Sequence, residues 1–330
     1  MRLYHLSILF SIASRRVRVV LRWLAFRFQP ARTRLFNGFI RKKRRRFILL
    51  LAAAGSIATG YLEAADSVLI PLWPEGSPNN PAGKNTPTLE IFSPFSPDHA
   101  IPATIVILPG GGYTTISRYE RLFAEYFRSL GYTAVVVTYR VAPHRHPAPY
   151  ADATRAIRLL RAHSTEWKVP ARNLALMGGS AGGHLAALVA TRPDLHLDPE
   201  DDLAGKISAL PDRLILAYPV ISAVKECAHC RSFTRLLAPN PSDEIRRELS
   251  PELHVSAQTP AVFLFHAADD KVVSVENSIA FARACWAKQV PAELHVFPRG
   301  GHGRVFAYAA DVSPRWRELL REWLAAWELK

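Results

Sequence analysis

Acidic residues are absent from the first 62 positions of this 330-residue chain, and the first one is Glu63. Residues 1–46 hold 14 of the 42 Lys and Arg residues, which leaves 28 for residues 47–330, equal to the 28 Asp and Glu residues. The formal charge of +14 therefore belongs to the tail, and the rest of the chain is neutral. Because nucleic-acid binding requires a basic surface, we expect no nucleic-acid partner for the globular part.

The amino-terminal region also lacks an apolar run of the ~20 residues that a membrane-spanning helix needs. Its uncharged stretch FILLLAAAGSIATGYL has only 16 residues and follows the basic run RKKRRR at 41–46. Small residues come next, at Ala64 and Ala65. This order is typical of a secretory signal peptide, although an uncleaved anchor is an open alternative. We expect an exported protein, periplasmic or secreted, with no stable membrane partner beyond that peptide.

The sequence therefore divides into three parts. Residues 1–46 form a basic tail, residues 47–65 are expected to hold the apolar region and cleavage site of the signal peptide, and residues 66–330 form the globular domain. Residues 1–40 mix arginine with Leu, Val, Trp and Phe, which is compatible with a basic helix on a membrane surface. We favour an over-extended gene start, because a signal peptide normally opens near its charged region.

Cysteine is scarce, and three residues are too few for a disulfide framework. Cys227 and Cys230 form a Cys-x-x-Cys pair, for which a local disulfide and two free thiols are both open. Cys285 falls in a helical stretch and is expected in the core. No group of acids and histidines has the spacing of metal ligands, so we expect no metal and no cofactor.

Six nearly continuous apolar runs alternate with helical stretches after the tail. The runs are those of strands buried on both faces, and they cover 104–108, 134–139, 173–177, 214–218, 261–266 and 293–297. The helical stretches lie near 117–130, 150–166, 181–192, 274–289 and 313–328, and one further strand is expected at 89–92. The alternation predicts an α/β fold with a mostly parallel sheet and helices on both faces. The segment 193–258 shows one strand and otherwise irregular sequence, which is short for a lid domain.

One glycine-rich junction lies between the third run and the helix that follows it. There GGSAG at 178–182 matches G-x-S-x-G, with Ser180 at its centre. In a nucleophile elbow the chain turns sharply from strand to helix and exposes the serine hydroxyl, while glycines two positions before and after avoid clashes. The strand and helix on either side make Ser180 the candidate nucleophile.

A serine hydroxyl needs a base, and the base needs an acid to orient it. Asp269 and Asp270 follow the run 261–266, and His302 lies in a glycine loop after the run 293–297. Ser, acid and His then occur in the chain order of α/β-hydrolases. The residues alone leave open which of the two aspartates is the acid.

The tetrahedral intermediate also needs amide donors for its oxyanion. One donor is expected from the backbone N–H of Ala181. The others are expected from the loop PGGGY at 109–113, whose glycines allow close approach to a substrate.

These motifs resemble the α/β-hydrolase superfamily and, within it, exported carbohydrate esterases of the acetyl xylan and feruloyl esterase type, related to hormone-sensitive-lipase-type esterases. The resemblance covers about residues 89–330 and rests on ILPGGGY, LALMGGSAGGHLAAL, FLFHAADDKVVSVENS and FPRGGHG. It implies an α/β-hydrolase fold without a large lid domain. It also implies Ser180 as nucleophile, His302 as base, Asp270 as the acid, and an oxyanion hole formed by Gly111, Gly112 and Ala181. Pro109 stands where the lipase-type pattern has histidine, which loosens the tie to that branch.

The expected function is that of a serine esterase acting on short acyl esters, with acetyl or feruloyl groups on plant polysaccharides or oligosaccharides as the implied substrates. A general carboxylesterase or lipase shares the motifs, as does a prolyl-oligopeptidase-like peptidase, which usually carries an additional large domain. A catalytically silent hydrolase-fold binding protein would lack a triad residue, and none is missing. The expected partner is the ester substrate, and the oligomeric state is not predicted.

Overall fold

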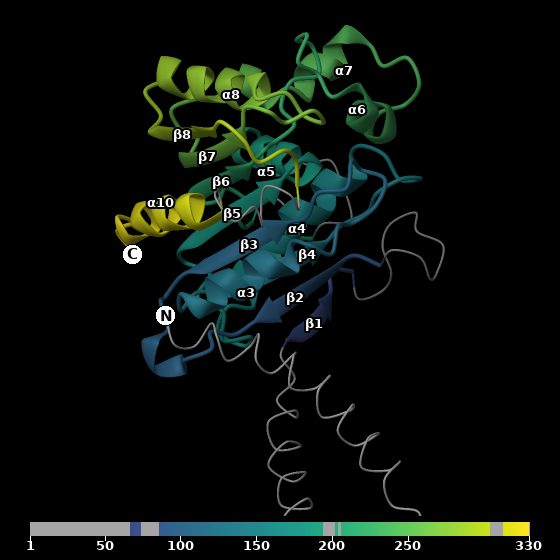
Figure 1. The fold of residues 1–330 in the computed structure, drawn as a ribbon. Coiled ribbons are helices and arrows are strands. Elements are labelled where there is room, and N and C mark those ends of the chain that lie inside the picture. The colour runs from purple at the N-terminus through teal and green to yellow at the C-terminus, as the bar shows by residue number, and fades with distance from the viewer. Residues whose placement is uncertain (1–66, 74–85, 194–201, 204–205, 304–312, 330) are drawn as a thin grey trace, which may run out of the picture. The chain divides into compact units, whose positions relative to one another are not determined.

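One eight-stranded sheet organises the part of the chain that the computed structural model describes, which comprises residues 67–73, 86–193, 202–203, 206–303 and 313–329. Its strand order is β1-β2-β4-β3-β5-β6-β7-β8 (Figure 1). The strands are β1 (Val68–Pro71), β2 (Thr88–Phe92), β3 (Thr104–Leu108), β4 (Thr133–Thr138), β5 (Leu174–Gly179), β6 (Arg213–Ala217), β7 (Ala261–Ala267) and β8 (Ala292–Phe297). The predicted tail (1–46) and signal region (47–65) lie outside these residues.

The central part of the sheet is parallel. Strands β4, β3, β5, β6, β7 and β8 pair in parallel, whereas β1 and β2 add two antiparallel pairings at one edge. These six parallel strands are the six predicted apolar runs, with ends shifted by two residues at most. Parallel strands bring their carboxyl ends to one edge of the sheet, so the loops after β3, β5, β7 and β8 can meet there.

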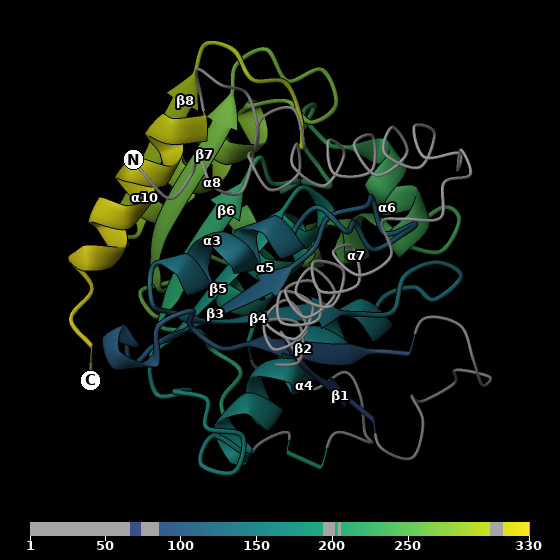
Figure 2. The same cartoon turned by 60° about the horizontal axis from the view of Figure 1, so that its bottom comes forward.

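Helices cover both faces of the sheet, as predicted. On one face, α4 (Ala148–Ala162), α5 (Ala181–Thr191) and α8 (Glu276–Ala287) pack on strand residues such as Val106 and Leu108. On the other, α3 (Arg121–Ser129) and α10 (Ser313–Ala325) pack on alternate residues such as Ile105 and Ile107. Figures 1 and 2 show these two layers. This burial on both faces explains why the central strands β3 and β5 are almost continuously apolar.

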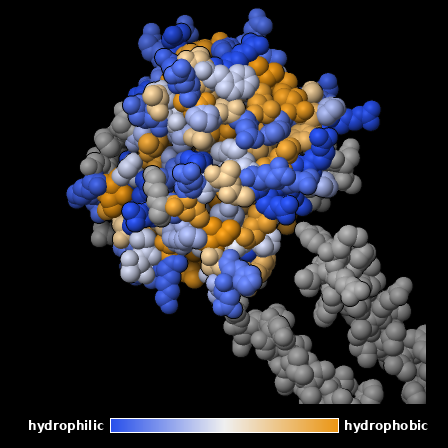
Figure 3. All heavy atoms as spheres, turned by 90° about the vertical axis from the view of Figure 1, so that its left-hand side faces the viewer, coloured by the Kyte–Doolittle hydropathy of each residue, from blue (hydrophilic) through white to orange (hydrophobic). Residues whose placement is uncertain are grey.

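The last helix buries a stripe of Trp and Leu against the sheet. Trp316 and Leu320 are fully buried on α10, and Trp316 stacks on Phe265 of β7 with ring centroids 4.8 Å apart. On the surface, apolar and hydrophilic side chains are interspersed over the face drawn in Figure 3. No helix of the described residues has the length and apolarity to cross a membrane.

The structure corrects the sequence interpretation at three elements. Strand β1 was not expected; it is an exposed edge strand that ends in Pro71, and an edge position tolerates proline. The segment after β6 is not irregular, because it holds the helices α6 (Cys230–Leu236) and α7 (Asp243–Glu248). Both helices are too short to show a clear hydrophobic period. Ser242 caps α7, because its hydroxyl accepts from the N–H of Ile245.

Candidate active site

Ser180 forms a sharp turn between β5 and α5. Its backbone has φ 55° and ψ −122°, a region that costs energy for a residue with a Cβ. The end of β6 and the loop after it hold this conformation, because the Ser180 N–H donates to Ala217 O (3.0 Å) and the Ser180 carbonyl accepts from Val220 N (3.0 Å). The predicted elbow is therefore present, with the serine at its apex.

The glycines of the elbow have different tasks. A Cβ on Gly178 would lie 2.1 Å from the carbonyl oxygen of Gly182, and a Cβ on Gly182 would lie 2.1 Å from that of Leu108. Real Cβ atoms do not approach a backbone oxygen so closely, so both positions require glycine. A Cβ on Gly179 would meet only the ring of Tyr218, at 3.4 Å. The close packing of strand, helix and neighbouring loop thus explains the G-x-S-x-G spacing.

His302 joins Ser180 to Asp270. The Ser180 hydroxyl lies 2.9 Å from His302 Nε2, and His302 Nδ1 lies 2.6 Å from Asp270 Oδ2. The carboxylate can only accept, so Nδ1 carries the proton and donates to it, while Nε2 accepts from the serine hydroxyl. The structure therefore brings together the three side chains that the sequence proposed as nucleophile, base and acid, although they lie on loops after three different strands.

Asp270 is held in its ionised form by the groups around it. Its Oδ1 accepts from the N–H groups of Val272 (2.8 Å) and Val273 (3.0 Å), and its Oδ2 accepts from His266 Nε2 (3.2 Å) as well as from His302. Burial acts to raise the pKa of this carboxyl, but the hydrogen bonds from His266 and His302 outweigh it, and the net pKa lies well below the usual range. A charged acceptor therefore faces the imidazole of His302.

Asp269 has a different contact from its neighbour. Its Oδ1 accepts from the backbone N–H of Gly301 at 2.8 Å, and within the described structure it makes no hydrogen bond to the imidazole of His302. The side chain therefore links the loop after β7 to the loop that carries His302. Of the two aspartates that the residues alone left open, only Asp270 contacts the histidine within the described structure.

The loop Pro109–Tyr113, called the glycine loop below, packs against the elbow. A Cβ on Gly110 would lie 3.2 Å from Ser180 Cβ, and the Gly110 N–H donates to Glu120 Oε1 at 3.0 Å. Gly111 has φ 129° and Gly112 has φ 62°, both in the region that favours glycine. The hydrogen bonds of the described residues leave the N–H groups of Gly111, Gly112 and Ala181 without an acceptor. These are the three predicted oxyanion donors.

A buried pair fixes the end of the glycine loop. The Tyr113 hydroxyl lies 2.7 Å from His184 Nδ1, and His184 Nε2 lies 2.8 Å from the carbonyl oxygen of Leu249. Nε2 must donate to that carbonyl, so Nδ1 accepts from Tyr113. Burial lowers the pKa of His184 from 6.5 to about 4, the carbonyl of Leu249 acts in the opposite direction, and His146 adds to the lowering. Both ring nitrogens of His184 are thus used in buried structural hydrogen bonds.

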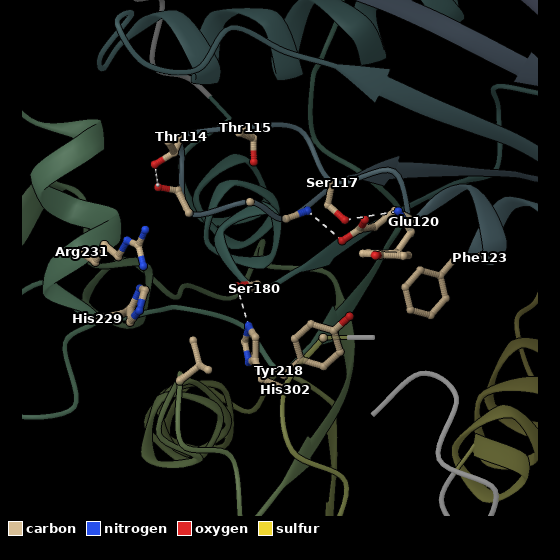
Figure 4. A pocket seen from close by; sticks show the side chains of 16 residues that line it. Thr114, Thr115, Ser117, Glu120, Phe123, Ser180, Tyr218, His229, Arg231 and His302 are labelled. Atoms are coloured by element: carbon tan, nitrogen blue, oxygen red, sulfur yellow. Dashed lines mark hydrogen bonds between the residues drawn. The ribbon is translucent and has the colours of Figure 1, made fainter. Parts of the chain in front are cut away.

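A cavity of about 500 Å³ opens above these groups. Ser180, His302 and Gly110–Gly112 line it, together with Tyr218, whose ring lies 4.9 Å from that of His302 (Figure 4). This volume falls in the range of small-molecule sites. A substrate in the cavity would therefore contact the serine, the histidine and the glycine loop together.

Other residues singled out in the sequence lie elsewhere. Cys227 and Cys230 are free thiols in this structure, and Cys285 is buried in the core as expected. Arg140 and Asp152 form a buried ion pair at 2.8 Å. Among the described residues no group of three or more His, Cys, Asp and Glu could hold a metal ion.

The family model BD-FAE matches residues 89–285, which is more than half of the chain. The chain belongs to the BD-FAE family. The resemblance to α/β-hydrolases of the carbohydrate-esterase type is thereby confirmed. The chain is 39% identical in sequence to an acetyl ester-xyloside bifunctional hydrolase from Caldicellulosiruptor lactoaceticus. Its structure matches the crystal structure of that protein with a TM-score of 0.72, over 78% of this chain and 96% of that one.

Three further similar proteins are named as an esterase, a xylanase and an acetylxylan esterase. The chain is 28% identical to a thermophilic esterase from Thermogutta terrifontis, with a TM-score of 0.64 over 79% of this chain and 92% of that one. It is 36% identical to endo-1,4-beta-xylanase B of Butyrivibrio fibrisolvens over 62% of this chain, and 26% identical to an acetylxylan esterase of Xylanibacter ruminicola over 70%. It spans 32% and 47% of the length of these two curated relatives. The α/β-hydrolase fold is confirmed.

Sequence reasoning missed several residues of this BD-FAE site. Tyr113 was quoted only as part of a motif, although its place directly after three glycines was a usable signal. Glu120 and Tyr218 line the cavity, but neither stands in a motif, so only the fold reveals them. Asp269 was named in the sequence only as an alternative acid, and its contact with Gly301 depends on two loops 32 residues apart.

Proposed function

We propose that the protein is a serine esterase that hydrolyses short acyl esters. Ser180 is the nucleophile, His302 is the general base and then the general acid, and Asp270 is the carboxylate that orients the histidine. The observation that carries the proposal is the continuous hydrogen bonding from Ser180 Oγ to His302 (2.9 Å) and from His302 to Asp270 (2.6 Å), at the wall of the cavity. The geometry has the base within reach of the proton that it must take.

In the acylation step, Ser180 Oγ attacks the carbonyl carbon of the ester while its proton moves to His302 Nε2. The negative charge of the tetrahedral intermediate lies on the former carbonyl oxygen, where the N–H groups of Gly111, Gly112 and Ala181 donate to it. The carbon–oxygen bond to the alcohol then breaks, and the alcohol leaves with the proton from His302. Asp270 stabilises the imidazolium throughout and stays ionised.

Water completes the cycle. His302 removes a proton from a water molecule, whose oxygen attacks the acyl-enzyme carbonyl, and the same donors hold the second oxyanion. When the bond to Ser180 Oγ breaks, the serine recovers its proton from His302 and the acid is released. The cycle consumes one water and returns every side chain to its starting state.

The proposed substrates are acetyl or feruloyl esters on plant polysaccharides or their oligosaccharides. Support comes from the relatives, which include an acetylxylan esterase, a protein named as a xylanase and an acetyl ester-xyloside hydrolase. The test is a panel of acetylated xylan, methyl ferulate, 4-nitrophenyl acetate, 4-nitrophenyl butyrate and a peptide amide. We expect turnover of acetyl or feruloyl esters with the highest kcat/KM, and its loss in Ser180→Ala. Preferred cleavage of the peptide amide would contradict the proposal.

Export is part of the proposal and rests on the sequence pattern at 41–65 alone. Amino-terminal sequencing of the mature protein from its native host or a bacterial expression host tests it. A mature terminus near Ala64 or Ala65 is expected. An unprocessed chain recovered from the cytoplasm would contradict it.

A further inference from the structure

One wall of the cavity comes from the segment around the start of α6. His229 and Arg231 belong to this segment and line the same cavity as Ser180 and His302. Figure 4 shows both side chains on the opposite side of Ser180 from Glu120. No step of the proposed hydrolysis uses His229 or Arg231. Because both side chains line the cavity, they can contribute to recognition of the substrate.

Arg231 carries a positive charge that the described structure does not compensate. The side chain is exposed, and no hydrogen bond, ion pair or ring contact with another described residue involves its guanidinium. The one acid among the residues that line the cavity is Glu120. Its carboxylate is buried and accepts from the N–H of Gly110. The guanidinium is thus available to a group that enters the cavity.

His229 does not share that charge at neutral pH. Burial lowers its pKa below 6.5, the charges of His302 and Arg231 act in the same direction, and Asp270 opposes them. Its Nδ1 bonds with the hydroxyl of Ser232 at 2.8 Å, which fixes the ring. The wall therefore presents one permanent cation, Arg231, beside a neutral ring.

We propose that Arg231 is a specificity-determining residue that binds a carboxylate of the substrate, so that esters bearing an acid group are preferred over neutral ones. A guanidinium offers a planar fork of donors that matches a carboxylate. The carboxylate has two possible sources: a uronic acid on the alcohol side of the ester, or an acidic acyl chain such as a hemisuccinate. The inference rests on the proposed esterase function and adds the charge of its substrate.

The experiment compares matched anionic and neutral esters on the full chain. For the alcohol side, the pair is 3-carboxy-4-nitrophenyl acetate and 3-carbamoyl-4-nitrophenyl acetate; for the acyl side, it is 4-nitrophenyl hemisuccinate and 4-nitrophenyl butyrate. The variants are Arg231→Gln, Arg231→Lys and, as matched control, Arg235→Gln. Arg235 is also exposed and lies one turn further along α6, but it does not line the cavity.

In Arg231→Gln, kcat/KM for the anionic ester of one pair is expected to fall roughly tenfold, with less than a twofold change for its neutral partner. Arg231→Lys should retain part of the preference, and 0.5 M salt should weaken it in the wild type. The pair that responds identifies the side of the ester that carries the acid. Equal changes for anionic and neutral esters in both pairs, or the same loss in Arg235→Gln, would overturn the inference.

The two proposals fail in different ways. If neutral esters are hydrolysed in a Ser180-dependent manner without any response to Arg231→Gln, the carboxylate subsite is wrong and the esterase function stands. If Ser180→Ala hydrolyses all four esters as fast as the wild type does, the proposed function is wrong.

Discussion

The Tyr113 hydroxyl donates to His184 Nδ1 at a distance of 2.7 Å, and this hydrogen bond connects the glycine loop to α5, the helix that follows the nucleophile. Both side chains are buried. Tyr113 comes directly after the proposed oxyanion donors Gly111 and Gly112. The bond therefore sets the distance between two parts of the site that approach each other from different strands.

Tyr113→Phe removes this hydroxyl and leaves His184 Nδ1 without a donor. We expect kcat for 4-nitrophenyl acetate to fall about tenfold with little change in KM, because the loop would lose the position that serves the transition state. The matched control is Tyr126→Phe, which removes the hydrogen bond of Tyr126 to the carbonyl of Arg317 away from the cavity. A kcat that falls equally in both variants would contradict a positioning role for Tyr113.

Acid should destabilise the fold through His184. Its pKa is lowered from 6.5 to about 4, so the unfolded chain takes up this proton at a higher pH than the folded chain. Neutral His184 contributes about 3 kcal/mol to the free energy of unfolding. This contribution is complete above about pH 6.5 and is lost as the pH falls to about 4. The pKa of His146 is also about 4, through burial, so it acts in the same window.

Urea unfolding at pH 7 and pH 4 measures this loss, and His184→Gln isolates its source. The variant should be less stable than the wild type at pH 7 and should lose less stability on acidification, with His146 and His229 contributing to the remainder. The contribution of Asp270 is lost only as the pH falls below the usual range of a carboxyl, because its folded pKa is lowered. An identical loss in wild type and variant would exclude His184 as the source.

Asp270 and Asp269 should respond differently to the same change. Asp270→Asn replaces the carboxylate that accepts from His302 Nδ1, and we expect kcat to fall by roughly 10⁴-fold. Asp269→Asn keeps an oxygen that can accept from Gly301 N, so a loss of about tenfold or less is expected. Steady-state kinetics of both variants decides between them. A larger loss at Asp269 would reverse the assignment of the acid.

The elbow glycines offer a matched pair for stability. Gly182→Ala places a Cβ about 2.1 Å from the carbonyl oxygen of Leu108, and the backbone there cannot move without disturbing β3. We expect a loss of about 3 kcal/mol or more in unfolding free energy. Gly179→Ala meets the Tyr218 ring at an ordinary 3.4 Å and should lose far less. Thermal unfolding compares the two, and equal destabilisation would refute the steric account.

The sheet and the main site residues were accessible from the sequence because each has a local signal. The inner parallel strands β3 to β7 are buried on both faces and so appear as unbroken apolar runs, whereas the edge strand β8 is partly exposed. Ser180 and His302 stand in glycine-rich turns directly after such runs. The order of the runs then places both residues at one edge of the sheet. These parts of the prediction rest on geometry that every parallel sheet shares.

The rest depends on contacts between distant segments. The sequence cannot show that Glu120 reaches the N–H of Gly110, or that Asp269 holds Gly301, because both bonds depend on the packing of loops. The choice of Asp270 required the resemblance to known hydrolases, since two adjacent aspartates have the same local pattern. Arg231 and Tyr218 were also invisible, because a cavity wall has no period and no motif.

The central claim is that Ser180 is the nucleophile of an acyl-enzyme mechanism. Intact mass spectrometry after exposure to diisopropyl fluorophosphate tests it directly, with peptide mapping of the product. We predict a single phosphoryl adduct on Ser180, formed in parallel with loss of hydrolysis of 4-nitrophenyl acetate, and no adduct on Ser180→Ala. An adduct on another residue, or full hydrolytic activity in Ser180→Ala, would contradict the account.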